Sequence, residues 1–470
     1  MAKSTNELVR RLDDSQLTGN HVKVVTAAVL GDLLEFFDNN IIGFVLAFII
    51  IPWGLSYGQT AYILLSSGVG SIIGAFLFGR WADKIGRRPI FITTIIFFSL
   101  ATGAQFFTPD GAWGYLTVFR FLTGVGIGGL YCVDLPLVQE FVPSKYRGRA
   151  SGIVTSFIPI GTMIASSTAA FLTPSIGWRG LFLIGLIPAA LTLLIRAWVP
   201  ESPRWLIRNG KYDQASAAVE WVTGNHDSFD HAKHEKSEWI NDLPEAPKAK
   251  FTEIFKYPRS VWTTWLANIF QQMAYICFSM WGAMLIALVT GCKPEQAAKL
   301  FIWVTLGGFV GRWFWAFMAD KIGRRLSGMI LGSAAAILLV IATTTTKTMV
   351  GETSLFWLFM IAIYFFADGG YALVGPYGSE VWPARLRATG MGSAYGMGGI
   401  GKIIGPMIIA IFAGSTNIIK PAATADAITP TYIFLAVCFA IMAVVFFFAR
   451  ETNGKTVEQI EAELEAESRA

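Results

Sequence analysis

Charged residues are scarce in this chain. Asp, Glu, Lys and Arg make up 15% of the 470 residues, whereas hydrophobic residues make up 54%. Soluble globular proteins carry about 25% charged residues. This scarcity of charge excludes an ordinary soluble domain and indicates a protein that is embedded in a membrane.

Cysteine and histidine are also rare, with four residues of each. The cysteines show no CxxC spacing, and they are Cys132, Cys277, Cys292 and Cys438. Only Cys292 lies near an expected outer loop, so we expect no structural disulfide. Three histidines lie in a polar segment and lack the spacing of metal ligands, so we expect no metal site and no cofactor. A cleavable signal peptide is not expected either, because Met1–Asn20 is polar and mixed in charge.

Two glycine-rich runs, Gly124–Gly129 and Gly396–Lys402, match the start of nucleotide-binding motifs. Neither run follows a strand, and the second continues with Ile403 where a P-loop requires Ser or Thr. Both lie in apolar runs, where glycine allows close helix packing. We therefore expect no nucleotide chemistry.

Long apolar runs fill most of the chain. A run of about 20 residues is needed to cross a hydrocarbon core of about 30 Å. Twelve runs meet this length, and they cover residues 22–51, 59–80, 89–108, 111–136, 148–172, 178–199, 259–289, 296–318, 326–345, 353–377, 386–413 and 430–450. They predict an all-α membrane protein with twelve transmembrane helices. The remaining segments, 1–21, 200–258 and 451–470, are polar.

Basic residues occupy alternate gaps between the apolar runs. These gaps hold Lys84, Arg87, Arg88, Lys145, Arg147, Arg149, Lys321, Arg324, Arg325, Arg385 and Arg387. The opposite gaps carry almost no charge. The positive-inside rule therefore places the basic gaps, the middle segment and both termini in the cytoplasm, with the chain in the plasma (cell inner) membrane. The same rule explains the net charge of +5, so no nucleic-acid partner is needed.

One motif occurs twice. Trp81–Arg88 reappears as Met318–Arg325, 237 positions later, and both copies contain Ala-Asp-Lys-Ile-Gly-Arg-Arg. Glu140–Arg147 likewise parallels Glu380–Arg387. Such self-similarity indicates a duplicated architecture. In a membrane chain, two parallel halves are typical of a secondary transporter with a site at their interface.

These motifs resemble the major facilitator superfamily over essentially the whole chain. The resemblance rests on Gly79–Arg88, Arg120 within Phe119–Gly126, the Glu140 and Glu380 elements, and Pro200–Leu206. It implies two six-helix bundles, 22–199 and 259–450, that rock around a site at the membrane midplane. The chain would then be a transporter and not an enzyme. Its partners would be the lipid bilayer and a small-molecule substrate, and we expect a monomer.

The repeated loop motifs predict a gate. At a seam between the halves, a carboxylate can pair with a guanidinium or cap a helix of the other bundle, and such pairs can break when that side opens. The candidate gating residues are Asp83, Arg87, Arg88, Glu140, Arg147, Asp320, Arg324, Arg325, Glu380 and Arg387. The alternative interpretation is a topological signal with solvated charges. Acidic residues at matched places in both halves favour the gate, because topology alone requires only the basic ones.

Charges within membrane spans are costly and are functional candidates by default. In the first half they are Asp32, Glu35, Asp38, Arg120 and Asp134. At a rise of about 1.5 Å per residue, Asp38 and Arg120 reach a similar depth, with Glu35 one turn away on the same helix face. Arg120 can therefore pair with Asp38, Glu35 or both in turn. Sugar porters have an Asp and an Arg at matching places, so the resemblance supports proton coupling here, although a static ion pair is the alternative.

In the second half, depth counting places Asp368 and Lys402 near the midplane. They could neutralise each other, or Lys402 could hold an anion. Glu35–Phe44 and Gly399–Pro406 resemble the first- and eleventh-helix motifs of aromatic acid and nicotinate-type carriers, with Lys402 replacing Arg. Gln271 and Gln272 resemble the paired amides of sugar porters. Two aromatic residues on the helices of Asp368 and Lys402, Tyr371 and Tyr395, complete the predicted substrate site.

These residues predict a secondary active transporter with protons as the coupling ion. The predicted cargo is a small organic anion, an aromatic or other monocarboxylate. In this prediction Glu35 and Asp38 take up the proton, Arg120 is the switch partner and Lys402 anchors the anion. One alternative is a symporter of neutral solutes such as sugars or polyols, with Gln271 and Gln272 as hydroxyl partners. Another is a nutrient receptor that binds but does not transport.

Overall fold

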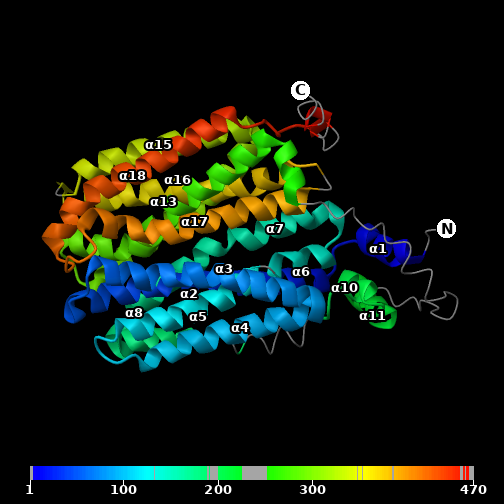
Figure 1. Ribbon diagram of the computed structural model, residues 1–470, viewed down its shortest axis with the longest axis horizontal. Coiled ribbons are helices and arrows are strands. Elements are labelled where there is room, and N and C mark those ends of the chain that lie inside the picture. Colours follow the sequence, from blue (N-terminus) through cyan, green and yellow to red (C-terminus); the bar gives the residue numbers. More distant parts are fainter. Residues whose placement is uncertain are drawn as a thin grey trace.

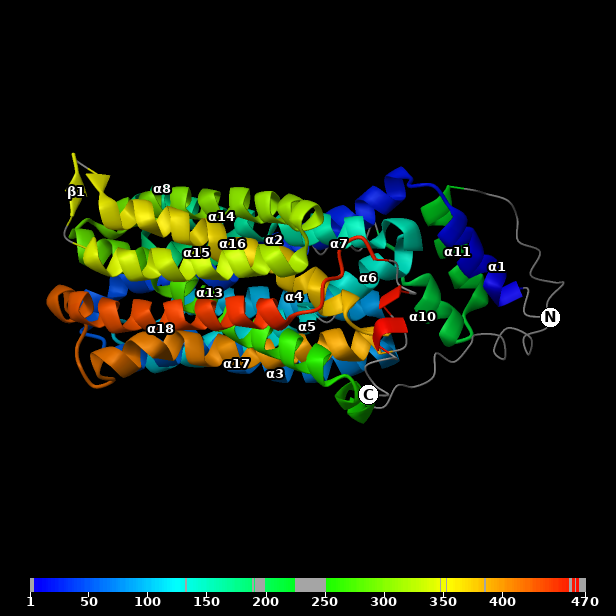
Figure 2. The same ribbon diagram turned by 90° about the horizontal axis from the view of Figure 1, so that it is seen from above.

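The computed structural model describes most of the chain. The described residues are 4–131, 133–187, 190, 199–224, 251–346, 348–351, 353–383, 386–455, 459–460 and 462–464. Two bundles of long helices lie side by side along the longest axis of the molecule (Figure 1). The blue and cyan bundle comes from the first half of the sequence, and the green, yellow and orange bundle comes from the second half. The helices of both bundles run nearly parallel to this axis (Figure 2).

The first bundle begins with four helices that match four predicted spans. They are α2 (Gly19–Trp53), α3 (Tyr57–Ile85), α4 (Arg87–Ala104) and α5 (Trp113–Tyr131), with a short 3₁₀ turn at Gln105–Phe107. The fourth span was predicted to run on to residue 136, but a separate helix, α6 (Asp134–Phe141), begins there. Asp134 therefore lies in the first turn of α6 and not in the body of a span.

The fifth span consists of two helices. These are α7 (Arg147–Ser156), which follows a 3₁₀ turn at Ser144–Tyr146, and α8 (Ile158–Ile184). Gly177 interrupts α8 with a φ of 68°, a left-handed conformation that glycine adopts readily. The sixth span begins after this break, and its later part, 188–189 and 191–198, lies outside the described residues.

The second bundle repeats the plan. Its helices are α13 (Pro258–Thr290), α14 (Pro294–Ile322), α15 (Arg324–Thr344), α16 (Leu355–Glu380), α17 (Arg387–Ala413) and α18 (Pro421–Phe448). A two-stranded antiparallel hairpin, β1 (Met349–Val350) and β2 (Thr353–Ser354), lies between α15 and α16. Among the described residues, ten helical segments are long and apolar enough to cross a membrane. Together with α5 these segments agree with the predicted twelve-helix fold, which confirms the fold class.

Short helices gather at one end of the bundles. They are α1 (Ser4–Asp14), α10 (Pro203–Arg208), α11 (Tyr212–Thr223) and a 3₁₀ segment, Phe251–Lys256. Leu8 of α1 packs with Trp205 of α10 and Val219 of α11 in a small apolar cluster. This end also carries the repeated Arg87, Arg88, Arg324 and Arg325, and we call it the basic end. The opposite end, which carries the β hairpin, is the far end (Figure 2).

Small residues bring helices of the first bundle into close contact. The α carbon of Gly74 lies against the backbone of Val125, and that of Gly128 lies against the backbone of Ser71, so a side chain at either glycine would collide. Small residues are enriched where membrane helices approach closely. The run Gly124–Gly129 thus packs α5 against α3, as its place in an apolar run predicts.

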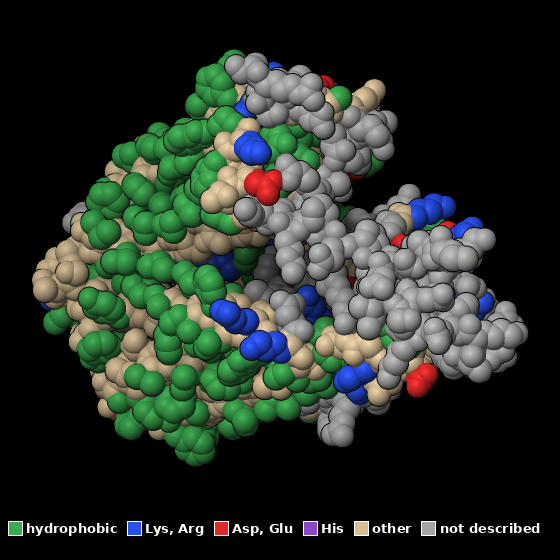
Figure 3. All heavy atoms as spheres, turned by 45° about the vertical axis from the view of Figure 1, so that its right-hand side comes forward, with side chains coloured by type: hydrophobic (Ala, Val, Ile, Leu, Met, Phe, Trp, Pro, Cys, Tyr) green, Lys and Arg blue, Asp and Glu red, His purple; other side chains and the backbone are tan. Residues whose placement is uncertain are grey.

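The two halves are joined by backbone hydrogen bonds at the far end. Tyr57 N–H donates to the carbonyl of Asn417 at 3.1 Å, and Gly58 N–H donates to that of Ser415 at 2.8 Å. In the opposite direction, Ile419 N–H donates to the carbonyl of Leu55 at 3.0 Å. Towards the basic end the surface divides into two lobes (Figure 3). The outer surface of both lobes is mainly hydrophobic, as contact with lipid requires.

Candidate functional site

The acidic face of α2 lies in the interior of the molecule. Asp32, Glu35 and Asp38 are each at most 3% exposed. Arg120 of α5, which is fully buried, places Nη1 3.4 Å from Asp38 Oδ2 and donates to the Asp38 carbonyl at 3.1 Å. The hydroxyl of Thr102 donates to the other carboxylate oxygen of Asp38. Depth counting thus placed Arg120 and Asp38 correctly within reach of each other.

Glu35 has different surroundings from Asp38. Its Oε2 atom is buried and has no hydrogen-bond partner among the described residues. The charged groups near Glu35 include Lys402 of the other half. Arg120 contacts Asp38 in this conformation.

Asp32 and Asp134 form an acidic pair between α2 and α6. The two side chains lie close together, and both residues are at most 1% exposed.

Asp368 is neutralised by a residue that was not among the predicted charges. Arg312 of α14 donates from Nε and Nη2 to the two carboxylate oxygens of Asp368, both at 2.9 Å. Asp368 is fully buried and Arg312 is 5% exposed. Mutual neutralisation of Asp368 and Lys402 was one of two alternatives, and in this conformation both carboxylate oxygens of Asp368 accept from Arg312 instead. The sequence signal that could have identified Arg312 is its position as a basic residue inside the apolar run 296–318.

Lys402 contacts a predicted aromatic partner instead. Its Nζ lies 3.0 Å from the hydroxyl of Tyr395 and 5.0 Å from the centre of that ring. Lys402 and Tyr395 are both half-buried. This contact places the Lys402 ammonium group beside the Tyr395 hydroxyl.

The two predicted amides have different surroundings. Gln272 accepts a hydrogen bond from the hydroxyl of Tyr371 at 2.7 Å, and the Tyr371 ring lies 5.2 Å from the guanidinium of Arg312. Gln271 is fully buried and donates to the carbonyl of Ala367 at 2.6 Å. Gln271 therefore ties α13 to α16, whereas Gln272 and Tyr371 lie beside the Arg312 pair.

The repeated motifs make the same contacts in both halves. Arg87 lies 3.6 Å from Glu140, and the carboxylate of Glu201 accepts from the N–H groups of Arg87 and Arg88 at 3.0 and 3.2 Å. Glu201 thus caps the first turn of α4. Gly86, at the corner before α4, has a φ of 125°, and a side chain there would collide with Glu201.

In the second half, Glu451 takes the place of Glu201. Its carboxylate accepts from the N–H groups of Arg324 and Arg325 at 2.9 and 3.0 Å. The Arg324 guanidinium lies 3.3 Å from Glu380 and 2.6 Å from Asp320.

The gating candidates were expected to pair across the seam, but the pairs observed here lie within one half. Arg87–Glu140 and Arg324–Glu380 each join helices of one half. The side chains of Asp83, Arg147 and Arg387 lie outside the described residues.

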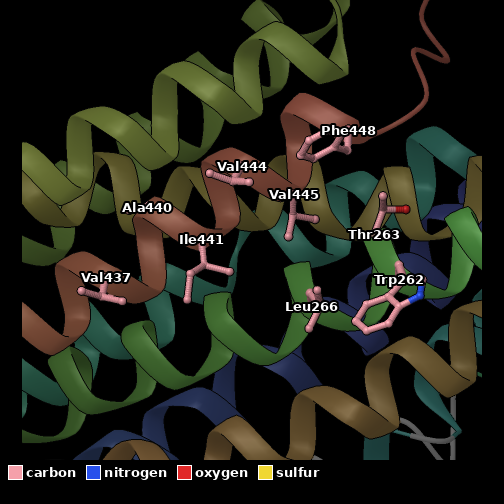
Figure 4. Close-up of a pocket in the computed structure, with 9 residues that line it drawn as sticks. All are labelled: Trp262, Thr263, Leu266, Val437, Ala440, Ile441, Val444, Val445 and Phe448. Carbon is pink, nitrogen blue, oxygen red and sulfur yellow. The ribbon is translucent and has the colours of Figure 1, made fainter.

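A groove of about 520 Å³ lies away from these charges, between α13 and α18. Figure 4 shows its lining residues on these two neighbouring helices, and they are Trp262, Thr263, Leu266, Val437, Ala440, Ile441, Val444, Val445 and Phe448. All except Thr263 are apolar. A groove with this lining offers no partner for a polar solute, so the candidate site is the charged region between the halves.

Comparison with known proteins places this geometry in a family. The model of the family described as "Sugar (and other) transporter" matches residues 23–464. The chain belongs to this family. It is therefore a membrane transporter of the major facilitator superfamily, which confirms the resemblance drawn from the repeated motifs.

This chain is similar to transporters of several solutes. It is 29% identical over 464 residues to the niacin transporter NiaP of Acinetobacter baylyi, covering 97% of this chain and 99% of NiaP. It is 26% identical to the benzoate transport protein of the same species, covering 84% of each chain. The inward-open structure of the xylose transporter XylE from E. coli has a TM-score of 0.72 at 19% identity, covering 94% of this chain and 99% of that one.

Proposed function

We propose that this transporter couples proton movement to the transport of a small organic anion, an aromatic or other monocarboxylate, by alternating access. The observation that carries the proposal is a buried carboxylate oxygen without a hydrogen-bond partner among the described residues, with a cation at a similar depth in the opposite half. The acid is Glu35 of α2, whose Oε2 atom is unsatisfied, and the cation is Lys402 of α17. Both helices begin at the basic end, α2 at Gly19 and α17 at Arg387. At a rise of about 1.5 Å per residue, Glu35 and Lys402 are both about 22–24 Å from that end.

This arrangement supplies a physical reason for coupling. An ionised Glu35 competes with a substrate carboxylate for the positive field of Lys402. Protonation of Glu35 removes that competition, so the proton favours the anion and, by linkage, the anion favours the proton. Asp38 is held by Arg120 and Thr102, and it supports α2 in this conformation. The pairing of Arg120 with Asp38 or Glu35 in turn is the switch in this scheme.

The names of the relatives fit an anionic cargo. Niacin and benzoate are both aromatic monocarboxylates, and a carboxylate is the partner that Lys402 can hold. Lysine is a point charge and lacks the two-pronged geometry of arginine, so Tyr395 and Tyr371 must supply the orientation of the ring. A neutral sugar is a less suitable cargo because Gln271 is committed to the Ala367 carbonyl.

The remaining parts of the proposal concern placement in the cell. We assign the basic end and both termini to the cytoplasm, in a plasma (cell inner) membrane, from the positive-inside rule. We further propose a monomer that needs protons as coupling ion and no other cofactor.

Uptake into proteoliposomes tests the cargo and the coupling together. Radiolabelled niacin, benzoate, xylose and a polyol are offered with and without an inward pH gradient. We expect the gradient to drive accumulation of at least one monocarboxylate and of neither neutral solute. Gradient-driven uptake of xylose, or binding of a carboxylate with no transport, would contradict the proposal and would favour a sugar carrier or a receptor instead.

A further inference from the structure

A proline breaks the fifth span at the seam between the halves. In an unbroken α-helix, the N–H of residue 159 would bond the carbonyl of Thr155. Residue 159 is proline and has no N–H, and α7 ends at Ser156 just before it. The sequence therefore removes the regular helical donor from the Thr155 carbonyl, and at the end of α7 the N–H of Phe157 is shared between the carbonyls of Thr155 and Val154.

The other half supplies a donor to the same carbonyl. Arg312 Nη1 donates to the Thr155 oxygen at 2.6 Å. The remaining guanidinium nitrogens are fixed by Asp368, which accepts from Nε and Nη2 at 2.9 Å each. Asp368 thus holds the Arg312 guanidinium in one orientation, and the remaining nitrogen, Nη1, points across the seam. A charge-assisted hydrogen bond in a buried place is stronger than a neutral one.

We propose that Arg312 is a latch that holds α14 to α7 through the carbonyl released by Pro159. The latch lies nearer the basic end than the proposed Glu35–Lys402 level. At the basic end, α14 ends at Ile322 and α7 begins at Arg147. The depth of Arg312 is therefore its distance from the end of α14, and the depth of Thr155 is its distance from the start of α7. Both residues are then about 12–15 Å from the basic end. The latch therefore restrains the seam beneath the site, and its opening widens the route from that site to the basic end.

The latch also contacts the candidate site. Tyr371 packs 5.2 Å from the Arg312 guanidinium and bonds Gln272. A solute that moves Tyr371 therefore changes the surroundings of Arg312. This inference rests on the alternating access of the proposed function, but it does not depend on which solute is carried.

Distance measurements between α7 and α14 test the latch without any substrate. Spin labels on p-acetylphenylalanine at positions 153 and 317 leave the native cysteines in place, and both positions are exposed on the helices that the latch joins. Pro159→Ala restores the helical N–H and gives Thr155 a competing donor. We expect it to raise the ratio of the wide to the narrow distance population by about tenfold, the value of one charged hydrogen bond. Arg312→Lys should shift the ratio in the same direction.

Pro174→Ala is the matched control, because Pro174 lies in the same helix α8 and releases a carbonyl far from Arg312. It should leave the distances unchanged. The latch is overturned if Pro159→Ala folds normally and gives the wild-type distribution, or if both proline variants widen the seam equally. Alanine favours a helix, so Pro159→Ala is expected to fold even if Arg312→Lys does not. A shift in distance together with failed carboxylate uptake would retain the latch and reject the proposed cargo.

Discussion

Ser279 of α13 donates a hydrogen bond to the side-chain oxygen of Asn40 of α2 at 2.6 Å, and this bond joins the two halves. The Asn40 amide in turn donates to Thr162 of α8 at 3.1 Å. On the other side, the Tyr364 hydroxyl donates to Ser279 at 3.3 Å. A buried chain of polar groups thus crosses the seam, and its members satisfy one another.

Ser279→Ala should weaken closure of the far end. The substitution leaves the Asn40 oxygen buried without this donor, which costs about 1–3 kcal/mol in the closed state. Water can satisfy the same oxygen when the halves part at this end. Accessibility of a cysteine placed at Tyr57, which is buried at the far end, should therefore rise severalfold. Ser166→Ala is the control, since Ser166 is also buried but donates to the carbonyl of Met163 in its own helix. Equal labelling in the two variants would show that the Asn40 bond does not hold the far end.

Removal of Asp38 should destabilise the folded transporter more than removal of both partners of its ion pair. Asp38→Ala leaves the fully buried Arg120 without its carboxylate, and loss of one partner of a buried pair costs about 3–5 kcal/mol. Asp38→Asn combined with Arg120→Gln removes both charges and should recover part of this loss. Thermal unfolding in detergent measures the difference. A double variant that is less stable than Asp38→Ala would show that the pair itself does not account for the effect.

Glu35→Gln should make the affinity for the anion independent of pH. In the wild type, anion affinity is expected to fall as the pH rises, because ionised Glu35 opposes a carboxylate near Lys402. Glutamine cannot ionise, so the variant should keep its low-pH affinity at high pH while losing uphill transport. Binding titrations across the pH range, together with counterflow assays, test both parts. A pH dependence as steep as that of the wild type would place the coupled proton elsewhere.

The cap formed by Glu201 should give stability a pH dependence of defined sign. Burial raises the pKa of Glu201 above its ordinary value of 4.5, with Glu140 adding to the rise, and three backbone N–H bonds offset only part of it. The folded state therefore holds the proton at a pH where the unfolded state releases it. The contribution to stability is present below the unfolded pKa and is lost as the pH rises through the folded pKa.

Thermal melts of the wild type and of Glu201→Gln, from about pH 4 to about pH 7, measure this contribution. Over the lower part of this pH range, the melting temperature of the wild type should fall relative to that of Glu201→Gln. Over the upper part, the difference between the two melting temperatures should stay constant. A relative gain in stability as the pH rises would contradict the raised pKa.

Hydropathy and repetition predicted the long helices and the duplicated plan because both depend on local sequence. Apolar runs fix where a helix can cross the membrane, and Ala-Asp-Lys-Ile-Gly-Arg-Arg marks equivalent corners in the two halves. The depth of Asp38 and Arg120 followed from the constant rise per residue of an α-helix. These features need no knowledge of how the helices are rotated.

The partners of the charges could not be predicted in the same way. Depth gives the level of Asp368 and Lys402 but not the direction in which each helix face points, so Arg312 was missed as the partner of Asp368. The break at Asp134 and the pairing of Arg87 and Arg324 within their own halves likewise depend on tertiary packing. The role of Pro159 emerges only when α14 is placed beside α7.

Uptake of a monocarboxylate by Lys402 variants tests most directly whether this chain is an anion transporter with its anchor on α17. The measurement compares wild type, Lys402→Arg and Lys402→Ala in proteoliposomes under an inward pH gradient, with the solute that the wild type accumulates. We predict that Lys402→Arg retains uptake because it keeps the positive charge, and that Lys402→Ala loses it. Uptake by Lys402→Ala with unchanged affinity would contradict the proposed anchor.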